Sequence, residues 1–510
     1  MDADFVVVGT GSAGSVLANR LGADPPARVV VLEAGPLDKD KFVHIPAGWP
    51  KLFRGPRDWN YLTEPQQELA GREIYWPRGK MLGGSSSMNA MMWVPGYAAD
   101  YDDWAVHAGS QWSFANVKPY FDRIENGPLH ICAQRSPRRS TAAWLAAAAE
   151  SGFRVGPPTD EQPEGFCEAR VTQRRGARCS TADAYLRPAL RRGNVSLLTG
   201  AMATRVMIER GRAVGIEFSQ DGQRRVVAAR REVVLCAGAV NTPQLLMLSG
   251  IGDRDQLSRH GIEVIHHSPE VGQNLLDHLF TPLVFAVIED TLFTADKPAN
   301  IANYFLRRRG LLTSNCAEAY GMIRSDPKLR LPDVELLFSP GPFLDEGLGV
   351  MSGHAVTMGA ILLQPKSRGQ ITLRSADVRD KPVIDPRYLS DPEGLDRATL
   401  MTGLRACATL AGAPPLRRLL GGIERPHDAR ALDEETLARA LEMCSHTLYH
   451  PVGTARMGVD GSSVVDPDLR VRGVAGLRVA DASVMPTIIR GHTHAPSVLI
   501  GEKAADLIRR

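Results

Sequence analysis

The first forty residues combine two short apolar runs with a small-residue turn and a helical pattern. Apolar side chains fill residues 5–8 and 29–32, and the turn GTGSAG at 9–14 leads into a helical stretch that ends at Leu21. Strand, glycine-rich turn, helix and second strand in this order are typical of a βαβ unit, whose two strands are parallel. The pattern therefore predicts a parallel sheet that begins almost at the N-terminus.

The glycines of this turn have the spacing that a dinucleotide pyrophosphate requires. Gly9 permits the tight turn, Gly11 lets backbone N–H groups approach the phosphates, and Gly14 lets the helix pack close to the strand. The unpaired N–H groups and the positive dipole end of the helix favour an anion at this point. The turn predicts a dinucleotide site, against the alternative of an ordinary α/β turn.

Glu33 ends the second strand, 24 positions after Gly9. A carboxylate at this offset can accept hydrogen bonds from both hydroxyls of an unphosphorylated adenosine ribose, which argues against NADP. The alternative is that Glu33 is a solvated strand end.

The segment after the second strand suits a long ordered excursion over a large ligand. Residues 36–80 lack clear periodicity but contain Trp49, Trp59 and Trp76, which argue against disorder. The glycine and serine turn GKMLGGSSSMNAMMW at 79–93 then runs into an apolar segment. Such a turn allows the backbone to come close to a cofactor.

Later segments return to the pattern of the N-terminal unit. Residues 117–152 are helical in pattern, 204–218 predict a hairpin, and 232–236 predict a strand. Residues 237–252 repeat the small-residue turn and helix, so we place them in the same sheet. The chain ends with a short strand at 477–481 and a helix.

The middle of the chain predicts a second domain. Apolar strand candidates occur at 282–288, 334–338, 355–363 and 369–373, separated by loops and helices. The predicted fold class is α/β. A discontinuous Rossmann-like FAD/NAD(P)-binding domain would comprise 1–155, 185–285 and 440–510, and an α+β substrate-binding domain built on an antiparallel sheet would comprise 156–184 and 286–439.

Composition excludes several classes of protein. With 60 basic and 57 acidic residues the net charge is +3, so no global field attracts nucleic acid, and the run Arg307–Arg309 is interpreted as a solvated face. The seven cysteines are scattered without a CxxC pair, which indicates neither a disulfide framework nor a zinc site. The early first strand leaves no room for a signal peptide, and no apolar run reaches the ~18 residues of a membrane span. We expect a soluble, cytoplasmic protein.

Four blocks taken together resemble the glucose-methanol-choline family of flavoprotein oxidoreductases over essentially the whole chain. They are GTGSAG with Glu33, GKMLGGSSSMN at 79–89, GAVNTPQLLMLSGIG at 238–252, and HPVGTARMG at 450–458 with DASVMP at 481–486. The resemblance implies FAD at the boundary between two domains, and oxidation of an alcohol by hydride transfer to flavin N5. The partners would be a small alcohol and dioxygen or another electron acceptor.

The resemblance also implies roles for two histidines. His450 of HPVGT is expected to be the active-site base, and His494 of GHTHAP is expected where relatives carry a second histidine or an asparagine. An imidazole suits both tasks, because its pKa lies near neutrality and either nitrogen can donate or accept. His492 would point to the opposite face if the segment is extended, and is interpreted as secondary.

The residues expected to bind the cofactor lie in the matching blocks and in the hairpin. They are Gly9, Gly11, Ser12, Gly14, Glu33, Met81, Gly84, Asn89, Val206, Asp481 and Ala482. Met88 stands where some choline-oxidising relatives carry a flavin-linked histidine, so FAD is expected to be bound non-covalently. Two histidines without a nearby obligatory carboxylate favour a neutral, primary alcohol over a quaternary amine, and the alternative is that an anion or an aromatic cage from the middle domain serves a quaternary amine.

Other chemistries receive less support. His446 and His450 have the spacing of zinc ligands on a helix, but Thr447 stands where a metalloprotease needs Glu, so no metal is expected. No GxSxG occurs, which excludes a hydrolase nucleophile elbow. A non-redox member of the same family, such as a hydroxynitrile lyase, is the alternative function. The alcohol, the electron acceptor, the oligomeric state and the access loops around 126–180 stay open.

Overall fold

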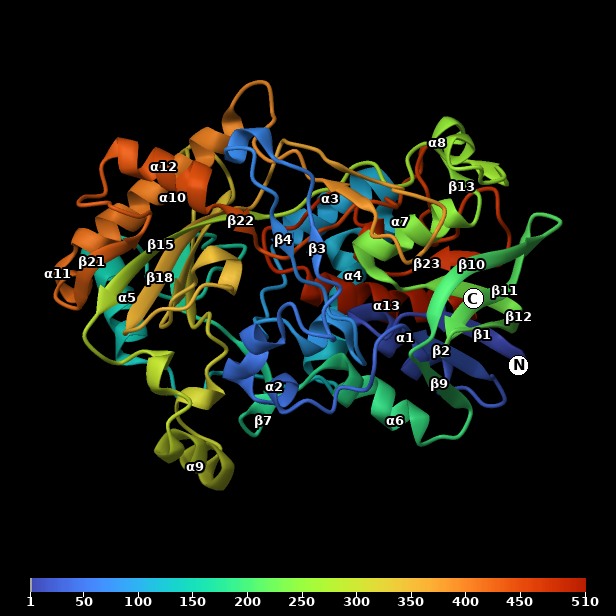
Figure 1. The fold of residues 1–510 in the computed structure, drawn as a ribbon, viewed down its shortest axis with the longest axis horizontal. Helices are drawn as coiled ribbons and strands as arrows, with labels where there is room; N and C mark the ends of the chain where they lie inside the picture. The colour runs from blue at the N-terminus through green and yellow to red at the C-terminus, as the bar shows by residue number, and fades with distance from the viewer. Residues whose placement is uncertain (1) are drawn as a thin grey trace.

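The computed structural model describes residues 2–510, in which two large sheets lie side by side (Figure 1). The first sheet contains the N-terminal strand β1, and the order of its main strands is β10-β11-β12-β1-β2-β9, with β23 paired to β12. The strands are β1 Asp2–Val8, β2 Val29–Glu33, β9 Val195–Thr199, β10 Met202–Glu209, β11 Arg212–Gln220, β12 Gln223–Leu235 and β23 Leu477–Val479. Strands β23, β12, β1, β2 and β9 are parallel, whereas β10 and β11 form an antiparallel hairpin on one edge.

Burial on both faces explains why β1 and β2 are continuous apolar runs. Helices α1 (Ser12–Leu21) and α13 (His494–Arg509) pack against each other beside these strands. A Cβ at Gly501 would stand 2.6 Å from the carbonyl oxygen of Ala13, so the two helices are in backbone contact there. The last helix therefore supports the helix that follows the glycine-rich turn.

The second sheet is antiparallel throughout and has the order β21-β15-β18-β17-β16-β6, with β22 paired to β15. Its strands are β6 Gly165–Glu168, β15 Leu279–Val287, β16 Ala319–Ile323, β17 Val334–Ser339, β18 Ala355–Leu362, β21 Leu420–Arg425 and β22 His446–Thr447. Helices α5 (Arg139–Glu150), α10 (Leu395–Gly412) and α12 (Glu434–Cys444) contact this sheet. The predicted fold class, a Rossmann-like domain joined to a domain with an antiparallel sheet, is confirmed.

The remaining elements are short or lie outside the two large sheets. The helices are α2 Lys41–His44, α3 Ala98–Ala108, α4 Phe114–Glu125, α6 Arg187–Leu190, α7 Gly238–Leu248, α8 Arg254–Arg259, α9 Pro298–Arg307 and α11 Pro414–Arg417. The strands are β3 Tyr61–Leu62 with β4 Tyr75–Trp76, β5 Ile131–Cys132 with β7 Val171–Arg174 and β8 Ala177–Arg178, β13 Ile251–Gly252 with β14 His266–His267, and β19 Gln370–Thr372 with β20 Val383–Asp385.

The chain crosses between the sheets at positions that differ from the expected boundaries. Strand β15 begins at Leu279, and both it and β22 belong to the second sheet, although 279–285 and 446–447 were assigned to the first domain. The segment 369–373 contributes β19 to a separate ribbon with β20, so it is not a strand of the large sheet. Pairing between segments distant in sequence decides these positions, and local pattern does not show it.

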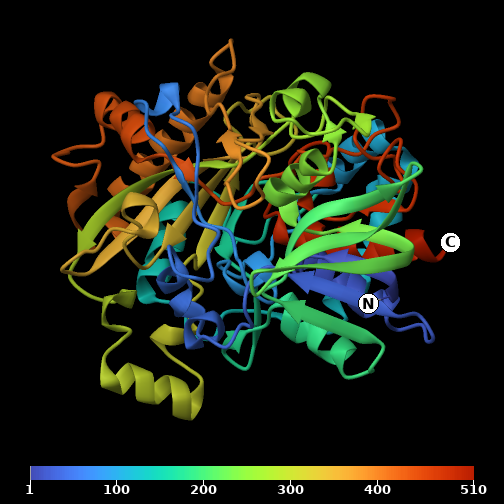
Figure 2. The same ribbon diagram turned by 45° about the vertical axis from the view of Figure 1, so that its right-hand side comes forward.

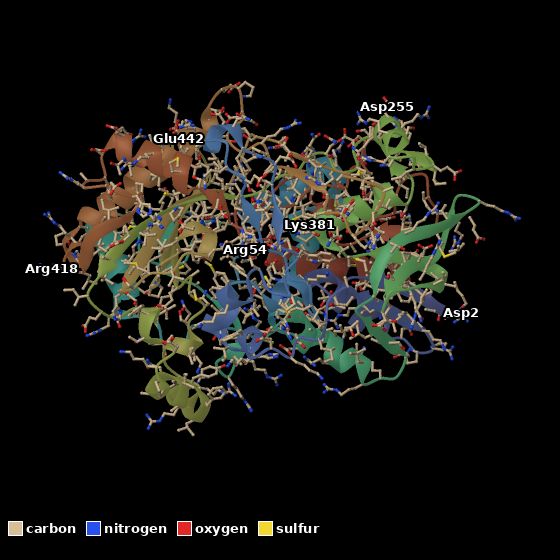
Figure 3. All side chains as sticks on the ribbon, viewed as in Figure 1. Asp2, Arg54, Asp255, Lys381, Arg418 and Glu442 are labelled. Carbon is tan, nitrogen blue, oxygen red and sulfur yellow. The ribbon has the colours of Figure 1, made fainter. Side chains whose placement is uncertain are left out.

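The long excursion at 36–80 is ordered by its aromatic side chains. Trp49 is 6% exposed and Trp76 is 1% exposed. In Figure 2, which turns the molecule by 45°, this blue segment runs between the two sheets. Charged side chains are spread around the outline of the molecule, as Asp2, Asp255, Arg418 and Glu442 illustrate in Figure 3, in keeping with the near balance of charge. Within residues 2–510, every helix is too short or too polar to span a bilayer.

Candidate active site

A cavity of about 300 Å³ lies between the two sheets. One side is formed by the glycine-rich turn at 9–13, the turn at 84–92, residues 201–203 at the start of β10, and the start of α7. The other side is formed by Phe280, Leu337 and Thr357 of the second sheet, together with residues 446–451 and 492–494. The cavity thus joins the segments that the sequence singled out.

The glycine-rich turn has the shape of a phosphate cradle. Gly9 has φ +102°, and a Cβ there would collide with the backbone of Cys236; a Cβ at Gly14 would collide with the carbonyl of Gly9. A Cβ at Gly11 would have no atom within 4 Å, so this position opens toward the cavity. No side chain caps the N-terminus of α1, which leaves its first N–H groups for an anion. These residues fit the pyrophosphate of a dinucleotide.

Glu33 lines the cavity, but its carboxylate also fastens the turn. It is 5% exposed; Oε2 accepts from the N–H and the hydroxyl of Thr10 at 3.1 and 2.5 Å, and Oε1 accepts from the N–H of Gly35 at 2.9 Å. Burial raises its pKa. A carboxylate offers about four acceptor positions, so these three contacts leave capacity for a ribose hydroxyl.

The turn at 79–93 packs against the phosphate cradle. Gly84 has φ +51°, and a Cβ there would stand 2.8 Å from the Cα of Gly11. Asn89 lines the cavity, and its Oδ1 accepts from Arg178 Nη1 at 2.7 Å and from the N–H of Met91 at 3.0 Å. The amide NH2 of Asn89 is therefore the group that remains available as a donor to a ligand.

Asp481 holds two backbone segments at the cavity wall. Its Oδ2 accepts from the N–H of Gly238 and the hydroxyl of Thr242, and its Oδ1 accepts from the N–H and hydroxyl of Ser483. Ala482 lines the cavity beside it. Through these four hydrogen bonds, Asp481 positions the start of α7 against the 481–484 turn.

Three of the residues expected to bind the cofactor do not line the cavity: Gly14, Met81 and Val206. Gly14 lies within α1, where it packs against the backbone of Gly9. Met81 is fully buried in a cluster with Val43, Leu52 and Met88, and Val206 is 1% exposed on β10. The residues of this strand region that line the cavity are Ala201, Met202 and Ala203. Val206 instead donates its N–H to Ser249 Oγ at 2.8 Å, so it ties β10 to the end of α7.

Three histidines meet at one end of the cavity. His450 is 9% exposed, its Nδ1 lies 2.9 Å from Nδ1 of the fully buried His278, and its ring centroid lies 4.8 Å from that of His492. His450 and His492 line the cavity. His492 lies in a turn before α13, so the assumption of an extended segment was wrong, and His492 rather than His494 lies beside His450.

The hydrogen bonds of His278 fix the tautomer of His450. The Nε2–H of His278 donates to the carbonyl of Leu363 at 3.2 Å, because a carbonyl oxygen can only accept. Burial lowers the pKa of His278 to about 3, so the ring is neutral and its Nδ1 is an acceptor. The proton in the contact between the two rings therefore belongs to Nδ1 of His450. Nε2 of His450 then carries a lone pair.

His450 is also neutral. Burial, followed by the neighbouring rings of His492 and His278 and the guanidinium of Arg78, holds its pKa well below the ordinary value. The ring of His492 is oriented separately, because its Nε2 lies 3.1 Å from Oε1 of the buried Glu335. A carboxylate can only accept, so Nε2 of His492 is the donor and Nδ1 is the atom left for another partner.

His494 contacts the phosphate cradle. Its Nδ1 lies 2.9 Å from Oγ of Ser12, and its ring meets Trp93 edge to face at 6.0 Å between centroids. Burial lowers its pKa to about 4. His494 thus lines the same cavity as His450 but is tied to the cofactor side.

Aromatic side chains surround the end of the cavity near His450. They are Trp49, Phe53, Phe280, Phe343, His446 and Tyr449. Phe343 and His446 have ring centroids 5.0 Å apart, and burial lowers the pKa of His446 to about 4. His446 lies in β22, so it does not share a helix face with His450. Among residues 2–510, the carboxylates that line the cavity are Glu33 and Asp481, and both accept hydrogen bonds from the turns that they hold.

Sequence reasoning missed His278 and misplaced the partner of His450. His278 follows Asp277, whose Oδ1 accepts the N–H of His450 at 2.8 Å. Its motif, NLLDH, gave no signal beyond a polar pair at the start of a strand. For His492, the signal that could have been used is its position two residues before the start of α13, where an extended backbone is not expected.

Comparison with known proteins identifies the family of the chain. Two family models described as GMC oxidoreductase match residues 3–280 and 365–501. An uncharacterized GMC-type oxidoreductase of Mycobacterium tuberculosis (strain ATCC 25618 / H37Rv) is 66% identical over 99% of both chains. Alcohol dehydrogenase [acceptor] of Pseudomonas putida is 39% identical over 99% of this chain and 96% of its own.

The fold is shared with solved structures. A formate oxidase variant from Aspergillus oryzae RIB40, solved to study FAD modification, superposes with a TM-score of 0.90 at 29% identity, over 100% of this chain and 98% of its own. Together with the family matches, this likeness shows that the chain is an enzyme that acts on CH–OH donors and belongs to the GMC oxidoreductase family of flavoproteins.

Proposed function

We propose that this enzyme oxidises a neutral, largely apolar alcohol to the aldehyde or ketone, with His450 as the base. The observation that carries the proposal is the His278–His450 contact, which leaves Nε2 of a neutral His450 with its lone pair. Bound FAD would supply the hydride acceptor for the alcohol carbon. Nε2 of His450 takes the hydroxyl proton, so that the carbonyl forms as proton and hydride leave.

His492 is the second group at the alcohol oxygen in this proposal. Its ring is held by Glu335 and lies beside His450, so Nδ1 is the ring atom that contacts the alcohol oxygen and orients the carbon. His494, which the sequence suggested for this task, is assigned to the cofactor side through Ser12. The positioned pair thus comes from two different turns, one before β23 and one before α13.

The residues that would hold FAD are those of the cradle and the turns around it. Gly11 and Ser12 face the pyrophosphate with the N-terminus of α1, Glu33 has capacity for the ribose, and the amide of Asn89 is a free donor. We propose that the attachment is non-covalent, because Met88 lines the cavity where some relatives carry a linked histidine.

The attachment can be checked by acid precipitation. The purified enzyme should be yellow, and acid should release all of its flavin into the supernatant as FAD, since the thioether of Met88 cannot form a histidyl link. Absorbance of pellet and supernatant measures this directly. A pellet that stays yellow would contradict non-covalent binding.

The lining near His450 favours neutral alcohols. Aromatic rings can pack against neutral groups and against quaternary ammonium groups alike, so the charge at this end decides. Arg78 lines the cavity and is close enough to lower the pKa of His450. Asp277 and Glu335 do not line the cavity: Asp277 accepts from Tyr388 and from the N–H of His450, and Glu335 accepts from His492. A cationic substrate would therefore meet the like charge of Arg78 with no carboxylate of this end in direct contact, and such a like-charge pair costs several kcal/mol.

Choline and its neutral isostere, in which a tert-butyl group replaces the trimethylammonium group, test this preference. We expect the neutral alcohol to reduce the flavin with a kcat/KM at least a hundredfold higher, a difference of about 2.7 kcal/mol. Anaerobic bleaching of the flavin is the measurement, and admission of air then separates an oxidase from a dehydrogenase. Equal kcat/KM values for choline and the neutral isostere would contradict the argument from charge. If no alcohol bleaches the flavin while a cyanohydrin is cleaved, the proposed oxidation itself fails.

A further inference from the structure

Helix α9 exposes apolar side chains that an ordinary surface helix would bury. It lies at the tip of a segment that projects from the second domain, at the bottom of Figure 1 and again at the lower left of Figure 2. Ile301, Phe305 and Leu306 are 39%, 56% and 84% exposed, and Ile301 and Phe305 stand one turn apart on the same face. Tyr304 is the one buried side chain of the helix. Amphipathic helices normally turn their apolar stripe toward the core.

The same segment concentrates positive charge. Lys297 precedes the helix, Arg307–Arg309 follow its apolar stripe, and residues 297–310 contain no Asp or Glu. All four basic side chains are exposed. The guanidinium carbon of Arg308 lies 4.9 Å from the ring centroid of Tyr304 and 5.8 Å from that of Phe305, so the charge sits beside the apolar face. The proposed alcohol oxidation does not involve this helix or its charges.

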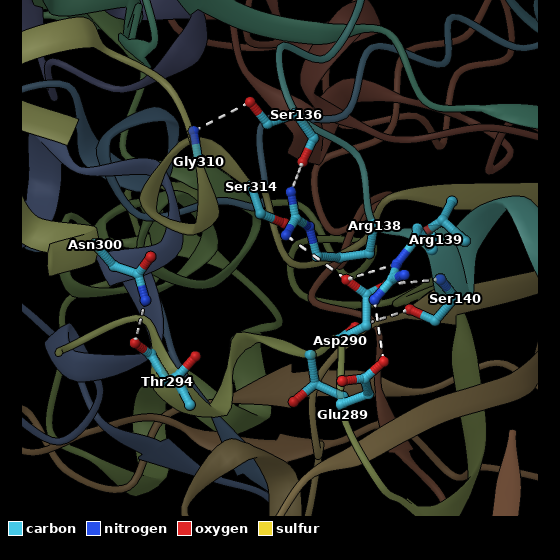
Figure 4. A network of polar contacts seen from close by, with 12 residues as sticks. Ser136, Arg138, Arg139, Ser140, Glu289, Asp290, Thr294, Asn300, Gly310 and Ser314 are labelled. Atoms are coloured by element: carbon cyan, nitrogen blue, oxygen red, sulfur yellow. Dashed lines mark hydrogen bonds and ion pairs between the residues drawn. The ribbon is translucent and has the colours of Figure 1, made fainter. Parts of the chain in front are cut away.

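Polar contacts fasten the two ends of the segment to the body of the protein (Figure 4). On one side, Asp290 accepts from the N–H of Ser140 at 3.0 Å, and its carbonyl accepts from the hydroxyl of Ser140 at 3.2 Å. On the other side, the N–H of Gly310 donates to Ser136 Oγ at 3.1 Å. Both ends of the excursion are therefore fastened to residues 136–140, and the helix between them is presented outward.

The chemistry of this tip matches an anionic lipid surface. Three apolar side chains expose at most a few hundred Å², less than the ~800 Å² per partner that a standard protein interface buries. An interfacial helix needs less, because apolar insertion and attraction of Lys and Arg to anionic headgroups add. We propose that α9 docks this enzyme on anionic membrane surfaces, with Ile301, Phe305 and Leu306 inserted at the headgroup boundary and Arg307–Arg309 pairing with lipid headgroups.

Vesicle sedimentation of the flavin-loaded enzyme tests the proposal. Wild-type protein is mixed with phosphatidylcholine vesicles that either contain or lack a third of phosphatidylglycerol, and flavin absorbance in the pellet reports binding. We expect binding to the anionic vesicles to be at least tenfold tighter than to neutral ones, and to weaken as salt is added. Leu306→Asp should lower the affinity at least tenfold, as should joint replacement of Arg307, Arg308 and Arg309 by Gln.

Val106→Asp is the matched control, because Val106 lies on α3, is 77% exposed, and receives the same added charge as Leu306→Asp. The control should bind like wild type. Flavin content and the rate of flavin reduction by alcohol in the absence of vesicles should be the same in all variants, which separates docking from the proposed function. The proposal is overturned if wild-type enzyme ignores anionic vesicles, or if Leu306→Asp binds them as well as wild type does.

Discussion

Replacing His450 by alanine should slow anaerobic reduction of the flavin by about a hundredfold to ten-thousandfold, the range of a positioned acid or base. The alcohol proton would then lose the base that the contact with His278 prepares, while the ring of His492 is held by Glu335 and that of His494 is engaged with Ser12. Stopped-flow reduction by saturating alcohol measures the effect. The affinity for the alcohol, from the same titration, should change far less.

His427→Ala provides the control for the first prediction, because His427 is exposed and lies outside the cavity. It should reduce at the wild-type rate. A His450→Ala enzyme that reduces its flavin as fast as wild type would remove this residue from the mechanism.

Replacing His278 by phenylalanine should slow the same step by about tenfold to a thousandfold, although His278 does not line the cavity. Phenylalanine fills the space but cannot accept the Nδ1–H of His450, so the proton can move to Nε2 and occupy the lone pair that the reaction needs. His278→Asn should recover part of the rate, because its amide oxygen can accept. Stopped-flow reduction of both variants is the measurement. If they react equally slowly, His278 acts by packing alone.

The N-terminal half of the fold could be predicted because its signals are local. Gly9, Gly14 and the apolar runs on either side of them constrain backbone geometry within a few residues, and the structure places β1, α1 and β2 where the pattern indicated. The hairpin of β10 and β11 is predicted for the same reason. The domain boundaries were less accurate, because β15 and β22 pair across a long stretch of sequence.

In the candidate site, too, residues marked by a local pattern could be predicted, and residues that depend on long-range contacts could not. Gly11 and His450 lie in turns whose composition marks them, Glu33 lies at the end of β2, and all three line the cavity. His278 could not be found, because its importance comes from a contact with His450 that joins the start of β15 to a turn far along the chain. His492 was set aside on the assumption of an extended chain, whereas the approach to α13 turns its ring toward His450.

The pH dependence of flavin reduction tests most directly the central claim, that a neutral His450 presents Nε2 to the alcohol. The rate is measured anaerobically with saturating alcohol, in wild-type enzyme, from acid to alkaline pH. Because burial and its neighbours hold the pKa of His450 well below the ordinary value near 6.5, the neutral form prevails throughout the neutral range. The account predicts a rate that is level through neutral pH and falls only on the acid side, well below pH 6.5. A rate that rises with pH through an ionisation at or above 6.5 would contradict it.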